Sequence, residues 1–549
     1  MEYRLPLAEF ANNVARHPNQ LWLHQPDNRE WRTLTWAQAD DQARRIAAGL
    51  LAQGFEKGDR IAIFAKNSAE WFIADLAIMM AGMISVPIYA TAGTSMIRHV
   101  MSHSEAKAVF VGKLDNTEAA ERAFEKGTQI ITFPYPTLSG TDKFTDWLER
   151  YGPLLKVNTP AAGDTFTLVY TSGSTGLPKG VVLTYENIAA ASGSAVTLHD
   201  KSIPNRSMSY LPLAHITERS VVEILSIYSP QEIFFVESLD TFIDDVRHAR
   251  PTTFVSVPRL WTKFQAQILA QLPDEKLQKL LKVPLVGKLV SKKIRKGLGL
   301  SQSRLCASGS APISPGILEW YDRLGISICE GWGMTETAGL SCANFPFDRK
   351  SLGTIGTAQE CVEMKLSNEG EVLIRGAAVF KEYYKNSQAT EDAFVDGWFR
   401  TGDRGVYENG VWKIIGRVKE QFKTAKGKYV APVPIESLLA RNADIEQVCV
   451  MGIGRKQPLA IVVMNEQIRH RSDDVRAKLQ KTLQEVNSEL ESHERLDHIV
   501  VSEEVWGIEN DMLTPTLKIK RNKLEERYGE YLTRQFSGTV VWESELEHQ

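Results

Sequence analysis

Short apolar segments rich in β-branched residues alternate with amphipathic segments along most of the chain. The run 59–65 (DRIAIFA) predicts a buried strand, and 68–82 (SAEWFIADLAIMMAG) predicts a helix with Ser68 as N-cap and Gly82 as its stop. The run 85–90 (SVPIYA) predicts the next strand. Strands and helices that alternate in this way form a mostly parallel sheet wrapped by helices. The sequence therefore predicts an α/β protein whose large N-terminal domain consists of layered β-sheets covered by helices.

The pattern changes towards the C-terminal end, where short strands are separated by glycine-containing turns. Asn409-Gly410 predicts a tight hairpin between two of these strands. The segment 416–432 (GRVKEQFKTAKGKYVAP) is dense in lysine and glycine, and we expect a domain boundary at its start. This boundary divides the chain into a large domain, residues 1–416, and a small α+β domain, residues 417–549.

The composition is that of an ordinary globular protein, with 43% hydrophobic and 24% charged residues in a chain of 549. A net charge of −3 argues against a nucleic-acid partner. The five cysteines show no CxxC spacing, which disfavours a disulfide framework or a structural zinc site. The N-terminal sequence lacks a basic leader followed by an apolar core, so we expect a cytoplasmic protein.

The stretch 170–180 (YTSGSTGLPKG) combines glycines, hydroxyl residues and one lysine. It follows the apolar run 166–170 and precedes 184–192 (TYENIAAAS), which predicts a helix, so we expect a loop between strand and helix. Glycines allow backbone N–H groups to point inward around an anion, and Lys179 adds positive charge. The spacing differs from that of the mononucleotide P-loop, in which Gly-Lys-Ser/Thr ends the motif, so an NTPase of that class is disfavoured.

TSGSTGLPKG resembles the phosphate-loop signature of the adenylate-forming superfamily, which contains acyl-CoA synthetases, peptide-synthetase adenylation domains and luciferases. Other stretches resemble further motifs of this superfamily and occur in the same order. They are YLPLAHITER (210–219) at the carboxylate site, ASGSAPIS (307–314) at the adenine turn, EGWGMTETAG (330–339) as the second signature, GWFRTGDRG (397–405) at the ribose site, and 416–432 at the hinge. The resemblance covers about residues 10 to 525.

The resemblance implies a two-step reaction with ATP, Mg²⁺ and coenzyme A as cofactors. A carboxylate attacks the α-phosphate of ATP and gives acyl-adenylate and pyrophosphate, and the thiol of coenzyme A then displaces AMP. Because an anion approaches an anion, the site needs cations and donors where charge develops. A small mobile domain that rotates about a hinge near Lys419 would let one site perform both steps.

The resemblance also assigns ligand contacts residue by residue. Phosphate contacts are assigned to Thr171, Ser172, Gly173, Ser174, Thr175, Gly176 and Lys179. Nucleotide contacts are assigned to Gly309, Ser310, Ala311, Glu330, Gly331, Trp332, Gly333, Met334, Asp403 and Arg417, with Trp332 against the adenine and Asp403 on the ribose. Magnesium is assigned to Glu336 with Thr175 nearby, and Thr335 would donate to the α-phosphate. Carboxylate and hydroxyl oxygens are suitable ligands for this metal.

The segment 513–524 (LTPTLKIKRNKL) lies where the superfamily has its adenylation lysine in a short Gly-Lys turn. Here Leu517 replaces the glycine, and we predict Lys518 as the catalytic lysine with Lys520 as the alternative. Gly427 would line the thiol tunnel after domain rotation, where a side chain would block the pantetheine.

Several stretches look most like the long-chain fatty acyl-CoA synthetase branch. In 255–264 (VSVPRLWTKF), Trp261 would be the gate of an acyl tunnel. His215 would lie near the substrate carboxylate, and a structural histidine is the alternative. We therefore expect a ligase for long- or medium-chain fatty acids. An aryl or other carboxylic acid, transfer to a carrier protein, and an ordinary phosphoryl-transferring NTPase stay open as alternatives.

Residues 276–297 place leucines and valines at helical spacing, with lysines at many of the other positions. Such a segment can lie on an anionic membrane or form a solvated helical excursion, and the sequence leaves both open. His99 and His103 are four residues apart without a third ligand in view, so we expect them on a helix surface and not in a zinc site.

Overall fold

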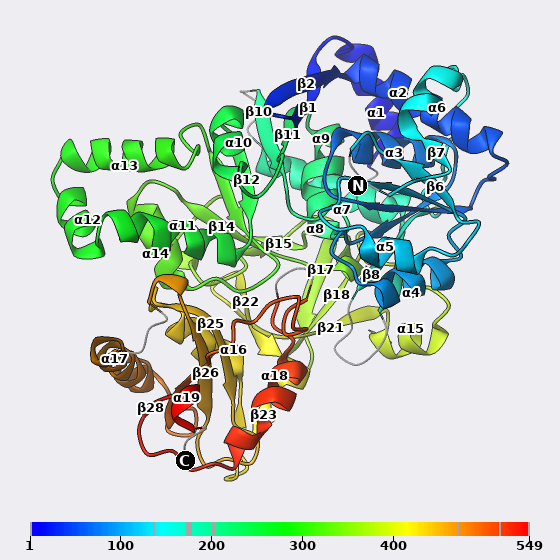
Figure 1. Cartoon of the computed structure of the whole chain (residues 1–549). Coiled ribbons are helices and arrows are strands. Elements are labelled where there is room, and N and C mark those ends of the chain that lie inside the picture. The colour runs from blue at the N-terminus through cyan, green and yellow to red at the C-terminus, as the bar shows by residue number, and fades with distance from the viewer. Residues whose placement is uncertain are drawn as a thin grey trace.

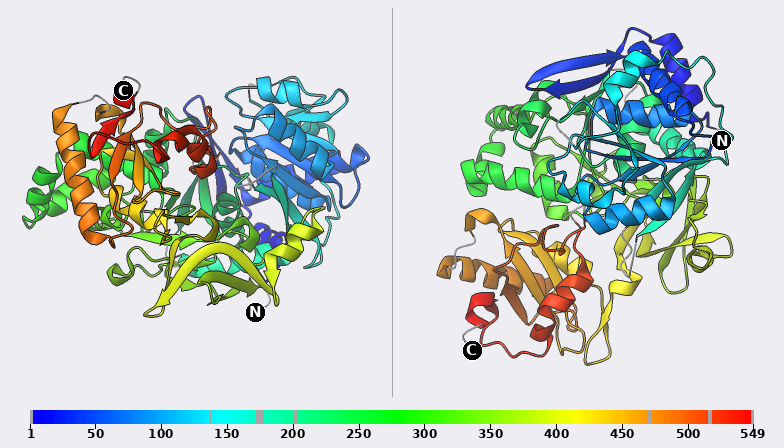
Figure 2. Two further views of the ribbon diagram at one scale, coloured as in Figure 1. Left: turned by 90° about the horizontal axis from the view of Figure 1, so that it is seen from below. Right: turned by 45° about the vertical axis from the view of Figure 1, so that its right-hand side comes forward.

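Two large sheets share one hydrophobic core in the N-terminal domain (Figures 1 and 2). This computed structural model describes residues 3–135, 138–171, 178–199, 204–468, 472–514 and 518–546. Sheet 1 contains, from edge to edge, β16 (Thr357–Ala358), β15 (Cys342–Ala343), β14 (Ile328–Trp332), β13 (Leu305–Ser308), β12 (Thr253–Ser256), β10 (Asn205–Ser209), β11 (Gln231–Phe235), β1 (Leu21–Asp27) and β2 (Glu30–Thr35). Sheet 2 contains β19 (Glu382–Tyr383), β9 (Lys179–Thr184), β8 (Thr165–Thr171), β4 (Ile84–Ile88), β3 (Arg60–Ala65), β5 (Ala108–Gly112), β6 (Gln129–Thr132) and β7 (Asp142–Lys143).

Helices fill the space between the two sheets and cover their outer faces. The shared core receives side chains from α1 (Pro6–Arg16), α2 (Trp36–Ala52), α3 (Ala69–Met80), α6 (Phe144–Arg150), α7 (Tyr185–Ser194) and the irregular segment α8 (Ile216–Glu218), η2 (Arg219–Ile224) and α9 (Leu225–Tyr228). The outer core on sheet 2 includes residues of α4 (Thr94–Ser104) and α5 (Glu118–Ala123). The outer core on sheet 1 includes residues of α10 (Phe242–Ala249), α11 (Pro258–Gln271), α12 (Asp274–Leu281), α13 (Val286–Gly297) and α14 (Pro315–Arg323). The short turns η1 (Ala195–Leu198), η3 (Thr335–Thr337) and η4 (Arg349–Ser351) complete these layers.

The α/β fold with mostly parallel strand pairing is confirmed. The predicted strand at 59–65 is β3, and the predicted helix is α3, with Ser68 accepting a hydrogen bond from the Trp71 N–H as its N-cap. Every residue of α3 is buried, as expected for a helix that is hydrophobic all round and lies inside a domain core. None of the helices among the described residues is both long and apolar enough to cross a membrane.

One local prediction was wrong. The loop after β8 does not lead directly into a helix, because β9 intervenes and pairs antiparallel with β8. Thr171 lies opposite Lys179 in this pairing, so β8 and β9 are the two arms of a hairpin, and α7 begins only at Tyr185. The valines and leucine of β9 are buried on both faces, which gives an apolar run without the alternation that marks a surface strand.

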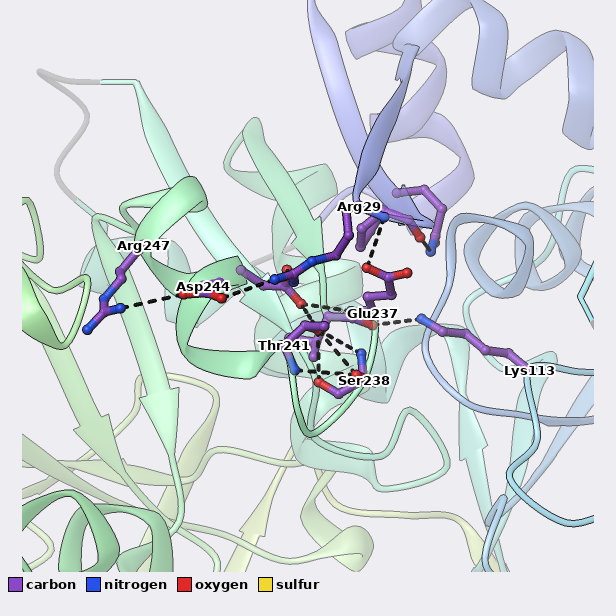
Figure 3. Close-up of polar contacts among 11 residues, drawn as sticks. Arg29, Lys113, Glu237, Ser238, Thr241, Asp244 and Arg247 are labelled. Carbon is purple, nitrogen blue, oxygen red and sulfur yellow. Dashed lines mark hydrogen bonds and ion pairs between the residues drawn. The ribbon is translucent and has the colours of Figure 1, made fainter. Parts of the chain in front are cut away.

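Polar groups link the sheets where their parallel strands end (Figure 3). Lys113, which follows β5, donates to the carbonyl oxygens of Asn67 at 3.0 Å and Val236 at 2.7 Å. Burial lowers the pKa of Lys113 to about 8. Beside it, Arg29 from the β1–β2 turn forms an ion pair with Asp244 of α10 at 3.1 Å. The Lys113 contacts therefore join the ends of β3 and β5 in sheet 2 to the end of β11 in sheet 1.

A third sheet leads from the large domain to the hinge. It contains β17 (Val362–Leu366), β18 (Glu371–Gly376), β21 (Trp398–Glu408), β20 (Phe394–Val395) and β22 (Val411–Arg417), with α15 (Ser387–Ala393) beside them. The predicted hairpin joins β21 to β22, and Asn409 and Gly410 both have positive φ, at 53° and 83°. Since β22 ends at Arg417 and pairs with β21, Arg417 still belongs to this sheet, two residues before the predicted hinge at Lys419.

The C-terminal domain has its own two cores on either side of a four-stranded sheet. Its elements are η5 (Val418–Glu420), β23 (Phe422–Lys423), β24 (Tyr429–Val430), α16 (Pro432–Leu439), β25 (Ile445–Met451), β26 (Leu459–Met464), η6 (Glu466–Ile468), α17 (Asp473–Glu489), β27 (His498–Val501), α18 (Arg521–Tyr528), η7 (Gly529–Leu532), β28 (Val540–Trp542) and α19 (Glu543–Leu546). All residues of these two cores follow Arg417 in sequence, so the small domain is a separate packing unit.

Candidate active site

An open, mostly apolar cavity runs along β12, β13 and β14, from Thr253 and Leu305 at the starts of two of these strands to Gly309 and Trp332 at their C-terminal ends. It encloses about 680 Å³, part of which is open to solvent. Its other wall is the irregular segment η2, which contributes Val221, flanked by Thr217 of α8 and Leu225 of α9. Ligands of α/β sheets commonly bind at the carboxyl ends of the strands, so this position fits a substrate site.

A buried ion pair anchors the cavity wall to sheet 2. Arg219, the first residue of η2, donates to both carboxylate oxygens of Asp75 on α3 at 2.6 Å and to Thr167 Oγ1 on β8 at 2.7 Å. Both charged side chains are almost fully buried. Because a buried charge without its partner is strongly destabilising, this pair fixes the start of η2 against the neighbouring strand.

The second signature forms a tight turn that admits no side chain at Gly333. A Cβ atom at this position would lie 1.5 Å from the carbonyl oxygen of Gly339, so only glycine allows the chain to close. The Gly339 N–H in turn donates to the carbonyl oxygen of Met334 at 3.0 Å. Ser220 of η2 donates to the carbonyl oxygen of Ala338 at 2.6 Å, which attaches the turn to the cavity wall.

The predicted adenine turn lies beside this signature. A Cβ atom on Gly309 would approach the carbonyl oxygen of Gly331 to 3.2 Å, which shows how closely the two segments pass. Ser310 has a φ of 67° and its hydroxyl lies 3.5 Å from that of Thr217. The sites predicted at 309–311 and 330–334 are therefore brought together: Ala311 follows directly on this turn, and Met334 closes the signature turn.

Glu336, the predicted magnesium ligand, is oriented by a tyrosine that the sequence did not indicate. The Tyr383 hydroxyl donates to Glu336 Oε1 at 2.8 Å, and the Lys179 ammonium lies 4.8 Å from the centre of the Tyr383 ring. Within the described residues, nothing else hydrogen-bonds the Glu336 carboxylate, which leaves it free to bind a cation. Thr335 precedes it in the same short turn, η3.

Asp403 is buried between two donors at the end of the third sheet. Trp332 Nε1 donates to its Oδ2 at 2.9 Å, and Arg417 Nε lies 2.9 Å from its Oδ1. Burial raises the pKa of Asp403, while Arg417 and Trp332 act in the opposite direction. A carboxylate oxygen can accept more than one hydrogen bond, so this geometry is compatible with ribose hydroxyls as additional donors.

Lys518 of the small domain lies among these residues of the large domain. Desolvation and nearby Arg417 lower the pKa of Lys518, and Asp403 and Glu336 oppose this shift. Lys518 nevertheless keeps part of its surface exposed to solvent. The Lys518 N–H donates to Thr514 Oγ1 at 3.0 Å, which holds the lysine in a turn. Lys520, the alternative, forms an ion pair with Asp511.

His215 is the N-cap of α8, where its Nδ1 accepts a hydrogen bond from the Thr217 N–H at 3.2 Å. Burial, with a smaller contribution from Lys518, lowers the pKa of His215 to about 3, so its imidazole is neutral at neutral pH. His215 caps a helix, which fits a structural role. It also lies near Lys518, which fits a position close to the substrate carboxylate.

Some predicted residues lie elsewhere or cannot be placed. Ser172, Gly173, Ser174, Thr175 and Gly176 lie outside the described residues, and with them the Thr175 part of the magnesium site. Trp261 is fully buried and packs against Phe254, Phe264 and Tyr321 in the outer core, so its role as a gate stays a prediction. Gly427 occupies the turn between β23 and β24.

His99 and His103 lie on a helix, α4, as expected, but they also contact the neighbouring hairpin. Both are half-buried on α4, and His99 Nε2 lies 2.9 Å from the carbonyl oxygen of Pro178. His103 Nδ1 lies 2.8 Å from the hydroxyl of Tyr170. Together they contact both arms of the β8–β9 hairpin beside its loop. In the sequence, the four-residue spacing of His99 and His103 indicated only that both lie on one face of a helix.

Comparisons with protein families agree with the two-domain division. Residues 10–384 match the family described as AMP-binding enzyme, and residues 419–538 match the AMP-binding enzyme C-terminal domain. Fatty acyl-CoA synthetase A of Dictyostelium discoideum is 32% identical over 91% of this chain and 85% of its own length. A long-chain-fatty-acid–CoA ligase of Mycobacterium bovis is 30% identical over 91% of both chains, and long-chain-fatty-acid–CoA ligase 5 of Mus musculus is 30% identical over 90% of this chain and 83% of its own length.

Solved structures share the fold at lower sequence identity. The adenylation domain of a carboxylate reductase from Mycobacterium chelonae superposes with a TM-score of 0.83 at 23% identity, over 96% of this chain and 91% of that chain. The anthranilate CoA ligase AuaEII in complex with anthranoyl-AMP gives a TM-score of 0.80 at 21% identity, over 97% and 98% of the two chains. These likenesses extend over both domains.

Proposed function

The chain belongs to the family of AMP-binding enzymes, and on this basis we propose that it is an AMP-forming ligase that joins a fatty acid to coenzyme A. The fatty acid is first adenylated by ATP with release of pyrophosphate. The thiol of coenzyme A then attacks the acyl carbon and releases AMP. Relatives that are long-chain acyl-CoA ligases and a largely apolar cavity support a fatty acid as the substrate.

The observation that carries this proposal is the position of Lys518 beside Asp403, Glu336 and Arg417. When a carboxylate attacks the α-phosphate, negative charge increases on the phosphate oxygens, and a positioned ammonium stabilises that charge. Asp403 would bind the ribose, and Lys179 would bind the outer phosphates. Mg²⁺, held by Glu336, would supply further positive charge to the phosphates.

The second step requires a different position of the small domain. Lys518 lies near Arg417, Asp403 and Glu336 in the observed arrangement, and coenzyme A would have to reach the acyl carbon held there. We propose that rotation about Lys419 withdraws Lys518 and brings the β23–β24 turn, with Gly427, to the site. Gly427 has a φ of 76°, a conformation that side chains rarely adopt, so its replacement would strain this turn as well as fill the tunnel.

An aryl acid is the second candidate substrate. Its support is the fold shared with the anthranilate CoA ligase and an apolar cavity wall that would also accept a flat ring. Both candidates predict the same nucleotide products, so the acid itself must be varied.

Product identity tests the proposal directly. The protein is incubated with ATP and Mg²⁺ and with acetate, octanoate, palmitate or benzoate, with and without coenzyme A. We expect AMP and pyrophosphate with octanoate or palmitate, and a thioester only when coenzyme A is present. Production of ADP and phosphate would contradict the class of reaction. Turnover with benzoate but with no fatty acid would leave the reaction class intact and replace the substrate.

A further inference from the structure

The corner between α12 and α13 exposes apolar side chains at the outer edge of the large domain (Figure 1). The inner face of α12 and α13 is packed against the outer core on sheet 1 through Leu277, Leu281, Val290 and Ile294. Four further apolar residues point away from that core, with exposed fractions of 47% for Val283, 73% for Leu285, 38% for Val286 and 67% for Leu289. Packing within this chain therefore does not explain why these four apolar side chains are exposed.

Beyond Asp274 and Glu275 in the first turn of α12, the same segment carries positive charge only. Residues 276–297 contain no aspartate or glutamate, and their basic residues are Lys276, Lys279, Lys282, Lys288, Lys292, Lys293, Arg295 and Lys296. The seven lysines are all exposed, and none of them forms an ion pair with a residue that the structure describes. This concentration of charge is local, since the whole chain has a net charge of −3.

One face of α13 combines a leucine with lysines, because Leu289, Lys292 and Lys296 follow one another at spacings of three and four residues. Leu285 is exposed at the N-cap of the same helix. The leucines lie at the corner, and the lysines lie one to two turns further along. A lipid surface matches this arrangement, because the leucines can enter the acyl boundary while long lysine side chains keep their ammonium groups among the phosphates.

We propose that the α12–α13 corner is a docking surface for membranes that contain anionic phospholipid. The surface lies on the outer side of sheet 1, apart from the apolar cavity, so the inference holds whichever acid the enzyme activates. A second copy of the chain is a poorer occupant, because a two-fold contact through this corner would bring the two sets of lysines together.

Vesicle sedimentation with the full chain tests the surface. One set of vesicles contains only phosphatidylcholine, and the other has part of it replaced by phosphatidylglycerol. We expect the protein to sediment with the second set and to stay in solution with the first. Added salt should weaken the binding, because each lysine near an anionic surface contributes roughly fivefold to the partition coefficient at low ionic strength.

Two variants separate the apolar and the charged contributions. Leu285→Gly/Leu289→Gln removes the exposed leucines, and glycine suits position 285, where φ is 66°. Lys288→Gln/Lys292→Gln/Lys293→Gln removes three charges. We expect each variant to lower the vesicle-bound fraction at least about tenfold while keeping the wild-type Tm and activity on a water-soluble acid.

Matched changes far from the corner serve as controls. Leu155→Gln alters a leucine that is 95% exposed, and Lys126→Gln/Lys143→Gln/Lys156→Gln removes three exposed lysines elsewhere. These controls should bind vesicles as the wild type does. Absence of wild-type binding to the anionic vesicles, equal loss in variants and controls, or unchanged binding in both corner variants would overturn the proposal. Loss of a concentration-dependent dimer in the corner variants, with vesicle binding unchanged, would assign the surface to self-association instead.

Discussion

Burial raises the pKa of acids in the site and lowers the pKa of bases. The consequence for each group depends on whether its role requires the charged or the neutral form. Lys518 loses affinity for its proton when the surrounding protein replaces water, whereas Glu330 gains affinity and its pKa rises to about 8. Lys518 needs the charged form for the proposed role. Glu330 accepts a hydrogen bond from the Gly353 N–H at 2.8 Å in a buried position, and its neutral form suits that environment.

Replacement of Lys518 should reduce adenylation far more than thioester formation. Removal of one positioned cation typically lowers a rate on the order of 10²–10³-fold, and Lys518→Ala should do so in acid-dependent ATP–pyrophosphate exchange. Transfer from supplied acyl-adenylate to coenzyme A should change little. Lys520→Ala is the matched control, because Lys520 is engaged with Asp511. Equal losses in both half-reactions would contradict the assignment.

The lowered pKa of Lys518 also predicts an alkaline limit. The ammonium is the active form, so kcat/KM for adenylation should be constant below the lysine pKa and fall as pH rises through it. Since the pKa in the free enzyme is below the ordinary 10.5, this fall should begin at a lower pH than for an unperturbed lysine. Lys518→Arg should shift the limit upward out of the accessible range, because arginine keeps its charge. If Lys518→Arg lost activity at the same alkaline pH as the wild type, the titrating group would be a residue other than Lys518.

Glu330 should make the stability of the protein depend on pH. Its pKa is about 8 in the folded state and 4.5 in the unfolded reference, so the folded state binds more protons between these values. Stability must then fall as pH rises through this window, by up to about 1.4 kcal/mol per pH unit. Glu330→Gln cannot titrate, so its Tm should decline less across the same window in calorimetric scans. A parallel decline in both proteins would contradict the raised pKa.

At the scale of elements, the β8–β9 hairpin is held by a helix from an earlier part of the chain. His99 of α4 contacts the carbonyl oxygen of Pro178, and His103 contacts the hydroxyl of Tyr170, one on each arm of the hairpin. These two arms carry the ends of the predicted phosphate loop. Contacts with α4 therefore help to hold the two strands that flank the predicted phosphate loop.

Loss of the His99 contact should weaken ATP binding. A neutral hydrogen bond contributes about 1 kcal/mol, so His99→Ala should raise KM for ATP about fivefold with a smaller effect on kcat. His99→Gln retains a donor and should recover part of the loss. His17, exposed after α1, provides the control as His17→Ala. An effect on Tm without any effect on KM would give His99 a purely structural role.

The local sequence pattern predicted individual helices, strands and turns better than it predicted which of them pair with one another. Ser68, Gly82 and the Asn409-Gly410 pair carry their signals within a few residues, and each lies where it was expected. The strand after the phosphate loop was missed because its apolar run, Val181 to Leu183, is too short to show a distinguishing period. Motif resemblance placed Glu336 and Asp403 in one site, but Tyr383 lies in no predicted motif and reaches Glu336 only through the pairing of β19 with β9.

At the scale of the whole molecule, residues of both domains meet in the candidate site, because Lys518 of the small domain lies near Asp403 and Glu336 of the large domain. Arg259 at the start of α11 forms an ion pair with Glu446 of β25 at 3.1 Å, across the boundary between the domains. The sequence could not predict this pair, because the two residues are far apart in the chain and meet only through domain orientation.

Reversal of this interdomain charge should change the balance between the half-reactions. Partly exposed ion pairs are worth up to about 1 kcal/mol, so Arg259→Glu should lower ATP–pyrophosphate exchange up to about fivefold. Transfer from acyl-adenylate to coenzyme A should be unchanged or faster, since it uses the other orientation. Arg259→Glu combined with Glu446→Arg should restore exchange. Failure of the double variant to recover would mean that the pair does not select the orientation.

The separate cores of the two domains have a consequence for a chain cut at the hinge. Each half keeps the residues of its own cores, so both halves should fold, yet the cut removes the covalent link between Lys518 and the site. A short flexible link holds its two ends at an effective concentration in the millimolar range. The two fragments, mixed at micromolar concentration, should therefore regain little adenylation. The residues around Lys419 would then act chiefly as a tether, and covalent reattachment by a new linker of similar length would restore the reaction.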